Sequence, residues 1–256
     1  MAEPRPAHAA EAPGPWASPG RAEAARRLIS LVDLTSLTGE ETDSELDTLC
    51  ARATTPAGPV AAVCVYGDKV GRVRASLPAS AVRIAAVANF PEGDADPARA
   101  REESAAAVAA GADEIDVVLP WRAWLARDHG AALAVVEAAR AQAPVLKVIL
   151  ESGALGETVN VAAAAKACLA AGADFVKTST GKREPGASPQ AARAMLEAVR
   201  DHGSGGFKAS GGVRDTRAAT EYLTLADDLL GSGWARPETF RIGASSLLDA
   251  LLTDAG

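Results

Sequence analysis

The chain has 256 residues, of which 48% are hydrophobic, and its net charge at neutral pH is −7. A chain of this length and composition can bury a full hydrophobic core in one large domain or two small ones. The negative charge and the lack of a long basic run argue against a protein that binds nucleic acid or a membrane surface. No stretch of about twenty apolar residues is present, so the sequence predicts no membrane-spanning helix.

The cysteines and histidines give no sign of a metal site. Cys50, Cys64 and Cys168 are an odd number without the spacing of metal ligands, and the three histidines form no paired motif. We therefore expect a reduced, cytoplasmic protein without a metal ion.

The first twenty residues differ in composition from the rest of the chain. They are rich in Pro, Ala, Gly and Glu and lack the cationic start and apolar stretch of a secretory signal. We predict a disordered tail over residues 1–20 and a single domain over residues 21–256, which opens with a helix near Arg21–Ser30.

Short apolar runs, which we predict to be strands, alternate with alanine-rich helical stretches along the rest of the chain. The runs are Leu31–Leu34, Val60–Val65, Arg83–Val87, Glu114–Leu119, Val145–Leu150, Asp174–Val176, Gly206–Lys208 and Phe240–Ile242. Capping residues between these runs predict the starts of three helices. Thr42 and Glu45 have the spacing of a capping box, while Ser188, followed by Pro189, and Asp215 are suited to N-cap positions.

A polar residue or a glycine stands at or just past the end of each run. These residues are Asp33, Cys64, Asn89, Asp116, Lys147, Lys177, Lys208 and Gly243. Their spacing of about thirty residues matches one strand–helix–strand step, so eight steps predict an α/β fold, a (β/α)8 TIM barrel with an extra N-terminal helix. An open doubly wound sheet is the main alternative, although its G-x-G-x-x-G fingerprint is missing. In a barrel these strand ends meet at one mouth.

Lysine is scarce, with six lysines against twenty arginines. Lys147, Lys177 and Lys208 nevertheless lie in apolar, strand-like runs, where an ammonium group is costly to bury. A lysine, unlike an arginine, can lose its proton and attack a carbonyl carbon. The sequence therefore indicates an enzyme that uses an amine nucleophile.

Lys177 is the candidate nucleophile, because it stands at a strand end and a flexible glycine loop follows it. Its pKa must fall by about three units from the ordinary value near 10.4 for the amine to be partly neutral at pH 7. We expect repulsion by Lys208, on the adjacent strand, to supply most of this shift and partial burial to supply the rest. The alternative is that each lysine forms a structural ion pair.

Three other strand-end residues are candidates for the same site. Asp116 can relay protons to and from a reaction intermediate, and it can also form a salt bridge to Lys147. Asp33 either takes part in the chemistry or only orients a lysine. We expect Cys64 to be a small buried residue and not a nucleophile, since no histidine lies in a strand-end motif.

Two segments of small residues, rich in backbone N–H groups, follow the seventh and eighth runs, and each precedes a predicted helix. Backbone amides and helix N-termini in such segments, Gly211–Arg214 and Gly243–Ser246, can bind an anion. The corresponding two loops of TIM barrels frequently bind phosphate. The sequence thus favours a phosphate site here, and Lys182 or Arg214 can complete its positive charge.

Seven motifs in this order resemble the deoxyribose-phosphate aldolases, a family of class I aldolases with a TIM-barrel fold. The resemblance covers about Leu31 to Leu252. Its motifs are Leu-Val-Asp-Leu-Thr at 31–35, Val-Ala-Asn-Phe-Pro at 87–91, Gly-Ala-Asp-Glu-Ile-Asp at 111–116, Leu-Lys-Val-Ile-Leu-Glu at 146–151, Asp-Phe-Val-Lys-Thr-Ser-Thr-Gly-Lys at 174–182, Gly-Phe-Lys-Ala-Ser-Gly-Gly-Val-Arg at 206–214 and Arg-Ile-Gly-Ala-Ser-Ser at 241–246.

The resemblance implies a reaction and a role for each matching residue. Lys177 would form the Schiff base, Lys208 would lower its pKa, and Asp116 would transfer protons. The residues expected to bind substrate are Asp33, Thr35, Cys64, Lys147, Thr180, Lys182, Gly211, Gly212, Arg214, Gly243, Ser245 and Ser246. The implied reaction is the reversible cleavage of 2-deoxy-D-ribose 5-phosphate to acetaldehyde and D-glyceraldehyde 3-phosphate in deoxynucleoside catabolism, with no metal or organic cofactor.

Two other functions remain open at this stage. The chain could be another Schiff-base aldolase of the same fold, or a catalytically inactive protein that binds a sugar phosphate. The intact set of Lys177, Lys208 and Asp116 argues against the inactive protein. The expected partners are small aldehydes and a sugar phosphate, with neither nucleic acid nor membrane. The family resemblance implies a homodimer, since dimers are common in the family.

Overall fold

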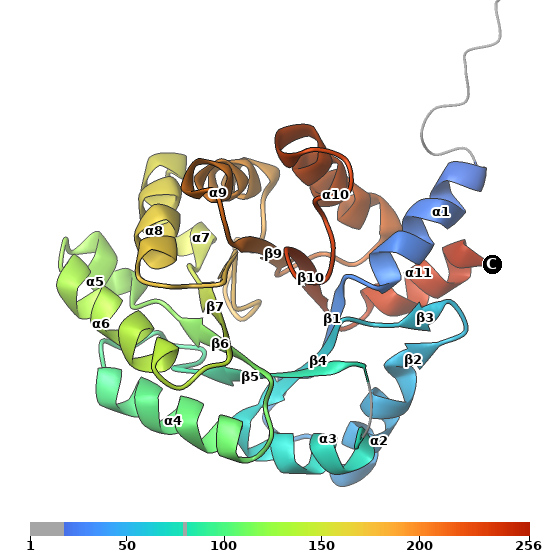
Figure 1. The fold of residues 1–256 in the computed structure, drawn as a ribbon, viewed down its shortest axis with the longest axis horizontal. Coiled ribbons are helices and arrows are strands. Elements are labelled where there is room, and N and C mark those ends of the chain that lie inside the picture. The colour runs from blue at the N-terminus through green and yellow to red at the C-terminus, as the bar shows by residue number, and fades with distance from the viewer. Residues whose placement is uncertain (1–17, 79–80) are drawn as a thin grey trace, which may run out of the picture.

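The computed structural model describes residues 18–78 and 81–256, and these residues form a closed barrel of eight parallel strands (Figure 1). The barrel strands are β1 (Val32–Thr35), β4 (Ala62–Tyr66), β5 (Arg83–Ala88), β6 (Glu114–Val118), β7 (Val145–Ile149), β8 (Phe175–Lys177), β9 (Gly206–Ser210) and β10 (Phe240–Ala244). Each lies on one predicted run, with ends shifted by two residues at most. The predicted (β/α)8 barrel is therefore confirmed.

The barrel closes because β1 pairs with β4 on one side and with β10 on the other, both in parallel. Outside it lies a short antiparallel pair, β2 (Thr54–Thr55) and β3 (Gly58–Pro59), which the sequence pattern did not predict. Two residues per strand are too few to give a recognisable alternation of apolar and polar positions.

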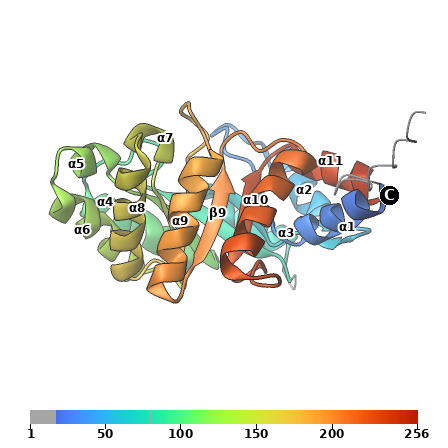
Figure 2. The same cartoon turned by 90° about the horizontal axis from the view of Figure 1, so that it is seen from above.

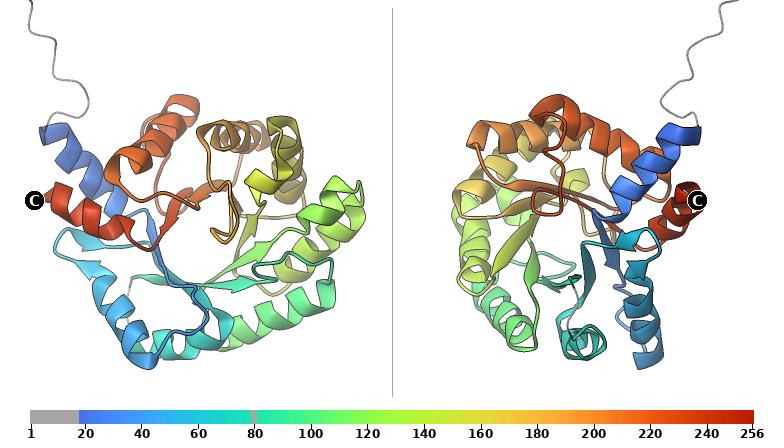
Figure 3. Two further views of the ribbon diagram at one scale, coloured as in Figure 1. Left: turned by 180° about the vertical axis from the view of Figure 1, so that it is seen from behind. Right: turned by 45° about the vertical axis from the view of Figure 1, so that its right-hand side comes forward.

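The helices surround the barrel (Figures 1 and 3), and Figure 2 shows α9 and α10 beside each other over β9. They are α2 (Asp43–Arg52), the 3₁₀ turn η1 (Gly67–Lys69), α3 (Val70–Ser76), α4 (Pro97–Ala109), α5 (Trp121–Leu125), α6 (His129–Arg140), α7 (Ser152–Leu155), α8 (Thr158–Ala170), α9 (Pro189–His202), α10 (Thr216–Leu230) and α11 (Leu247–Ala255). Among the described residues, no helix combines the length and apolarity needed to cross a bilayer.

An extra helix, α1 (Ser18–Ile29), precedes the first strand and lies against α11 (Figure 1). The guanidinium of Arg26 donates a hydrogen bond of 2.9 Å to the carbonyl of Ala255, which ties the two helices together. The sequence predicted this helix near Arg21–Ser30. Residues 1–17 of the predicted tail lie outside the described residues, and the division into a tail and one domain stays a prediction.

The three predicted helix starts are confirmed. Thr42 and Glu45 form a reciprocal capping box at the start of α2. The side chain of Ser188 accepts a hydrogen bond from a backbone amide in the first turn of α9, and Asp215 does the same at the start of α10. These bonds satisfy amides that have no partner inside the helix, so they fix where each connection from the barrel ends.

The interior of the barrel and the layer between strands and helices have opposite chemistry. On β6, Ile115 and Val117 pack into the main hydrophobic core. The alternate residues Glu114 and Asp116 are buried too, but they take part in ion pairs within the barrel. This alternation follows from the two-residue period of a strand, and it concentrates the ionisable groups on the barrel axis.

Candidate functional site

A cavity of about 340 Å³ lies at the C-terminal ends of the strands, where it is lined by residues from the ends of β1, β8, β9 and β10 and the loops that follow them. Ten of the residues predicted for the site line it: Thr35, Lys177, Thr180, Lys182, Gly211, Gly212, Arg214, Gly243, Ser245 and Ser246. The barrel thus brings together segments more than two hundred residues apart in the sequence.

Beneath the cavity, Asp116 is in contact with three lysines. Its Oδ1 atom accepts a hydrogen bond of 2.7 Å from Lys147, and its Oδ2 atom accepts bonds of 2.8 Å from both Lys177 and Lys208. Lys177 and Lys208 are direct neighbours in the register of β8 and β9. The salt bridge between Asp116 and Lys147 that the sequence offered as an alternative is therefore present.

Asp33 connects the lysines to an arginine deeper in the barrel. One of its oxygens is in contact with Lys208, and the other accepts a hydrogen bond of 2.6 Å from Arg241. Arg241 also donates a bond of 2.8 Å to Glu114, which in turn forms an ion pair with Lys147. Asp33 is fully buried, and whether it takes part in the chemistry or only orients Lys208 stays a prediction.

The lysines of this cluster differ in the direction of their pKa shifts. Burial is the largest influence on the pKa of Lys177 and lowers it; Asp116 opposes this shift, and the ammonium of Lys208 adds to it. The net pKa of Lys177 is below its ordinary value. Burial also acts on Lys147 and Lys208, but their neighbouring carboxylates outweigh it and raise both pKa values.

This result reverses the order of causes expected from the sequence. Repulsion by Lys208 was expected to supply most of the shift at Lys177, with burial as the remainder. Burial contributes more, because the Lys177 side chain is only 3% exposed. The carboxylate oxygen that opposes this shift is shared with the ammonium group of Lys208. The direction of the shift agrees with the expectation.

Asp116 is ionised in this arrangement. Burial alone would raise its pKa, but the ammonium groups of Lys147, Lys177 and Lys208 outweigh burial and hold the pKa well below its ordinary value. An ionised carboxylate can accept a proton but has none to donate, so any proton that Asp116 passes on must first reach it from another group.

Five predicted substrate-binding or catalytic residues do not line the cavity: Asp33, Cys64, Asp116, Lys147 and Lys208. Four of them form the ion cluster below it. Cys64 is fully buried, and burial raises the pKa of its thiol. The thiol is thus protonated, as expected for a small buried residue.

The predicted anion-binding segments form one wall of the cavity. Gly211 and Gly212 both have positive φ angles, +92° and +87°, which suit glycine and turn the chain sharply before α10. At position 243 glycine is favoured for a steric reason, since a Cβ atom there would lie 3.0 Å from Cε of Lys208. At the rim, the ammonium of Lys182 donates a hydrogen bond to the carbonyl of Leu37.

Sequence reasoning missed two residues beside the site. Arg241 appeared only as the first residue of the motif at 241–246. Its place inside the predicted strand Phe240–Ile242 was nevertheless a signal that its side chain is buried. Glu151, at the end of another motif, is fully buried with a φ of 52°, and its carboxylate accepts a bond of 2.6 Å from Thr180. Burial raises the pKa of Glu151.

The remaining lysines lie away from the barrel axis. Lys69 is in η1 and Lys166 is in α8, and their side chains are 24% and 56% exposed. Lys166 forms an ion pair of 3.0 Å with Asp201. Within the described residues, no group of three or more His, Cys, Asp or Glu side chains could hold a metal ion.

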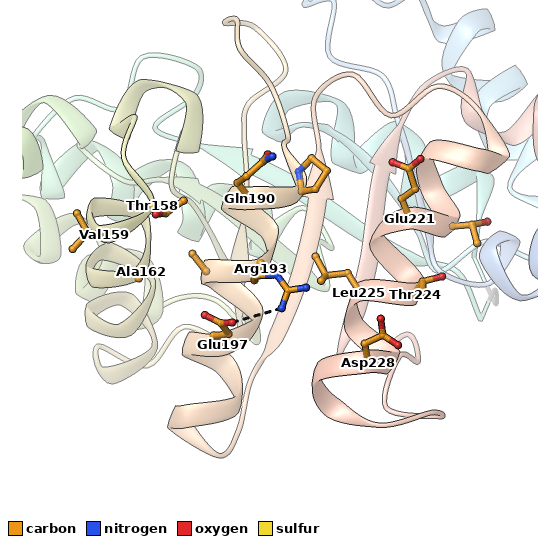
Figure 4. A pocket seen from close by; sticks show the side chains of 13 residues that line it. Thr158, Val159, Ala162, Gln190, Arg193, Glu197, Glu221, Thr224, Leu225 and Asp228 are labelled. Carbon is orange, nitrogen blue, oxygen red and sulfur yellow. Dashed lines mark ion pairs between the residues drawn. The ribbon is translucent and has the colours of Figure 1, made fainter.

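A larger cavity, of about 910 Å³, lies outside the barrel between α8, α9 and α10 (Figure 4). The sticks in Figure 4 show an ion pair along α9 between Arg193 and Glu197, with Leu225 of α10 near Arg193 and Val159 on the far side of α8. None of the predicted site residues lines this cavity. Its size therefore does not make it the better candidate for the reaction.

Solved structures with the same fold cover nearly the whole chain. A provisionally named deoxyribose-phosphate aldolase of Toxoplasma gondii matches with 24% identity, 93% of this chain, 96% of that chain and a TM-score of 0.85. A provisionally named deoxyribose-phosphate aldolase of Coccidioides immitis has 29% identity, 88% and 85% coverage and a TM-score of 0.77. The tetrameric deoxyribose phosphate aldolase of Aeropyrum pernix has 24% identity, 93% and 97% coverage and a TM-score of 0.73.

A family model extends this likeness from fold to sequence. The model of the DeoC/LacD family aldolases matches residues 27–252, which include all the barrel strands and the cavity described above. The chain belongs to the DeoC/LacD family of aldolases.

Proposed function

We propose that this protein is a Schiff-base aldolase that reversibly cleaves 2-deoxy-D-ribose 5-phosphate to acetaldehyde and D-glyceraldehyde 3-phosphate. The observation that carries the proposal is the position of Lys177. It is the lysine of the ion cluster that lines the mouth cavity, and its pKa is lowered while those of Lys147 and Lys208 are raised. A neutral amine facing a cavity can attack an aldehyde carbon.

The reaction would begin when Nζ of Lys177 attacks C1 of the open-chain sugar phosphate. Loss of water from the carbinolamine gives an iminium ion. The bond between C2 and C3 then breaks as the C3 hydroxyl loses its proton, which releases glyceraldehyde 3-phosphate and leaves an enamine on Lys177. Protonation of the enamine at C2 and hydrolysis of the iminium ion release acetaldehyde and restore the free amine.

Asp116 is suited to move the protons in this sequence. Its carboxylate is ionised and 2.8 Å from Nζ of Lys177, so it can take up a proton there directly or through water. It is also hydrogen-bonded to the ammonium groups of Lys147 and Lys208, which hold it in the ionised form that can accept a proton. The proton that it takes from Nζ of Lys177 can then pass to the carbinolamine oxygen as water leaves, which supports a relay.

The opposite wall of the cavity suits the phosphate group. Gly211, Gly212, Ser245 and Ser246 offer backbone amides and hydroxyls close to the starts of α10 and α11. Lys182 and Arg214 line the same cavity and add positive charge. The distribution of these groups supports a phosphorylated substrate, as the reaction requires. A role in deoxynucleoside catabolism and a homodimeric state remain predictions from the family resemblance.

Trapping with borohydride tests the covalent step. Incubation with acetaldehyde and sodium borohydride is expected to fix a two-carbon adduct on Lys177, and Lys177→Arg is expected to abolish it. Lys166→Arg, which alters an exposed lysine, serves as the matched control and should leave trapping intact. Recovery of the adduct on another lysine would overturn the assignment of Lys177.

A coupled assay tests the substrate. We expect 2-deoxyribose 5-phosphate to release glyceraldehyde 3-phosphate, and acetaldehyde to act as the donor in the reverse direction, with no turnover of dihydroxyacetone phosphate. Turnover with dihydroxyacetone phosphate or release of pyruvate would point to another Schiff-base aldolase. Binding of the sugar phosphate without turnover would point to an inactive binding protein.

A further inference from the structure

The barrel interior contains an unequal number of buried cations and carboxylates. The four cations are Lys147, Lys177, Lys208 and Arg241, and the three carboxylates are Asp33, Glu114 and Asp116. If all seven groups are ionised, the cluster carries one positive charge in excess. An uncompensated buried charge is strongly unfavourable, so the excess is removed most easily by loss of one proton.

The contacts show which cation can lose a proton at the lowest cost. Arg241 forms ion pairs with two carboxylates, at 2.6 Å to Asp33 and 2.8 Å to Glu114. Lys147 and Lys208 are also in contact with at least two carboxylates each. Lys177 has one carboxylate partner in the cluster, and the oxygen that it contacts is shared with Lys208. The proton of Lys177 is therefore held least firmly.

Arg241 lies at the other end of the cluster from the reaction site. It lines a second cavity, together with the first residues of β5, β6, β7 and β8, whereas Lys177 lines the mouth cavity. We propose that Arg241 is a positioning residue. Its ion pairs with Asp33 and Glu114, at the end of the cluster away from the mouth cavity, keep the Lys177 amine neutral. The catalytic meaning of this inference rests on the proposed function of Lys177.

The effect follows from the charge balance. With Arg241 present, three carboxylates face three cations when Lys177 is neutral. Without Arg241, the same three carboxylates face three cations only when Lys177 is protonated. Arg241 also fixes one oxygen of Asp33, which leaves the other for Lys208 and holds that ammonium group beside Lys177.

Other ionisable groups near Lys177 lie outside the ion cluster or already belong to it. Cys64 on β4 is a protonated thiol, because burial raises its pKa. Glu151, in the loop after β7, interacts with Lys177 from the rim, but burial raises the pKa of Glu151, its carboxylate binds Thr180, and Arg183 lies near enough to act on it. Asp116 on β6 and Lys208 on β9 are already members of the cluster.

The test is a charge cycle in which the pKa of Lys177 is read directly, without substrate. Arg241→Met removes a cation and is expected to raise this pKa by on the order of one unit. Glu114→Gln removes an anion and is expected to lower it by a similar amount. The double variant removes both charges and is expected to return the pKa to within about 0.5 unit of the wild-type value.

Nuclear magnetic resonance of protein with carbon-13 at the lysine ε position gives the readout. The chain has six lysines, so each titrating signal can be assigned by substitution. The acidic limb of kcat/KM is expected to move with the pKa of Lys177. Because the reactive amine is neutral, a higher pKa shifts the loss of activity at low pH to a higher pH.

Arg241→Lys separates charge from packing. It keeps the positive charge and alters the geometry, so the pKa of Lys177 should move by much less than it does in Arg241→Met. If Arg241→Met does not fold, Glu114→Gln and Arg241→Lys still decide the matter. Shifts of the same sign in Arg241→Met and Glu114→Gln, or no downward shift in Glu114→Gln, would overturn the inference.

The two proposals fail in different ways. If the charge cycle shifts the pKa of Lys177 as expected but borohydride traps nothing on it, the proposed reaction is wrong and the electrostatic inference stands. If trapping on Lys177 succeeds but its pKa does not respond to the cycle, the reaction stands and Arg241 has only a structural role.

Discussion

The two sides of the barrel interior differ in chemistry near the mouth. On the side of β4 to β7, an apolar cluster includes Val87, Phe90, Val118 and Ile149. Val118 and Ile149 follow Asp116 and Lys147 by two positions, so they lie on the same strand faces one step nearer the mouth. On the side of β8 to β10, the equivalent step offers glycines, hydroxyls and backbone amides around the cavity.

This difference matches the two products of the proposed reaction. Acetaldehyde is small and apolar apart from its carbonyl group, whereas glyceraldehyde 3-phosphate carries two negative charges. Lys177 lies between the two sides, in the cluster of Asp116 and at the edge of the cavity. In the proposed reaction, an apolar wall beside the amine would also limit the access of water to the enamine. The comparison teaches that the surroundings of Lys177 are asymmetric, as the proposed reaction requires of a lysine that handles both a polar and an apolar aldehyde.

Asp116→Asn alters the ion cluster that lies between the two sides of the interior, and it should have the largest effect. It removes the carboxylate that three lysines share, so we expect kcat to fall by about 10²- to 10⁴-fold and the free energy of unfolding to fall by about 3–5 kcal/mol. Steady-state kinetics and urea denaturation measure the two changes. Asp113→Asn, which alters an ion pair with Arg74 at the other end of the barrel, should keep kcat near the wild-type value. A wild-type kcat in Asp116→Asn would contradict the proton relay.

Ser246→Asp tests the polar side. A carboxylate at this exposed N-cap position would repel the substrate phosphate, so KM for 2-deoxyribose 5-phosphate should rise by about 10- to 100-fold. Aspartate is a good N-cap residue, so the start of α11 should be preserved. KM for unphosphorylated 2-deoxyribose should not change, and Ser204→Asp, in the loop before β9, should affect neither substrate. Equal effects on both substrates would place the phosphate elsewhere.

Val118→Thr tests the apolar side with a change of nearly constant size. The buried hydroxyl should lower the free energy of unfolding by about 1–3 kcal/mol. We expect KM for acetaldehyde to rise by up to about 10-fold while KM for glyceraldehyde 3-phosphate stays the same. Val117→Thr puts the same group on the outward face of β6, in the main core, and should lower stability without changing either KM. If both variants change KM alike, the apolar wall has no specific part in binding acetaldehyde.

Asp128→Ala should have the smallest effect, because it lies outside both sides of the interior. Asp128 caps α6 by accepting a hydrogen bond of 3.1 Å from the amide of Ala131. Its loss should lower the free energy of unfolding by about 1 kcal/mol and leave kcat/KM unchanged. Thermal unfolding and the coupled assay measure these quantities. A fall in kcat/KM would mean that general loss of stability alone can account for effects on activity.

The fold was predictable because each barrel strand combines an apolar run with a polar end, and these recur at a spacing that one strand–helix step requires. The positions of Lys177, Lys208 and Asp116 near one another followed from that repeat. The β2–β3 pair was not predictable, since four residues carry no periodic pattern.

The electrostatic interactions within the site could be predicted less well from the sequence. The repeat predicted that Lys208 is a neighbour of Lys177, but it could not show that both ammonium groups contact the same oxygen of Asp116. Arg241 was missed for a related reason. Its guanidinium reaches Asp33 and Glu114 from strands remote in the sequence, and such contacts depend on side-chain direction inside a closed barrel.

The distribution of lysines has a practical consequence for attaching the protein to a solid support. Three of the six lysine side chains are buried on the barrel axis, whereas Lys182 is exposed at the rim. Coupling through side-chain amines would therefore fall on Lys166, on the outer helix α8, and on Lys182, beside the mouth cavity. With Lys182 replaced by arginine, a resin that reacts with amines would hold the molecule by its outer wall and leave the entrance of the barrel open to dissolved aldehydes.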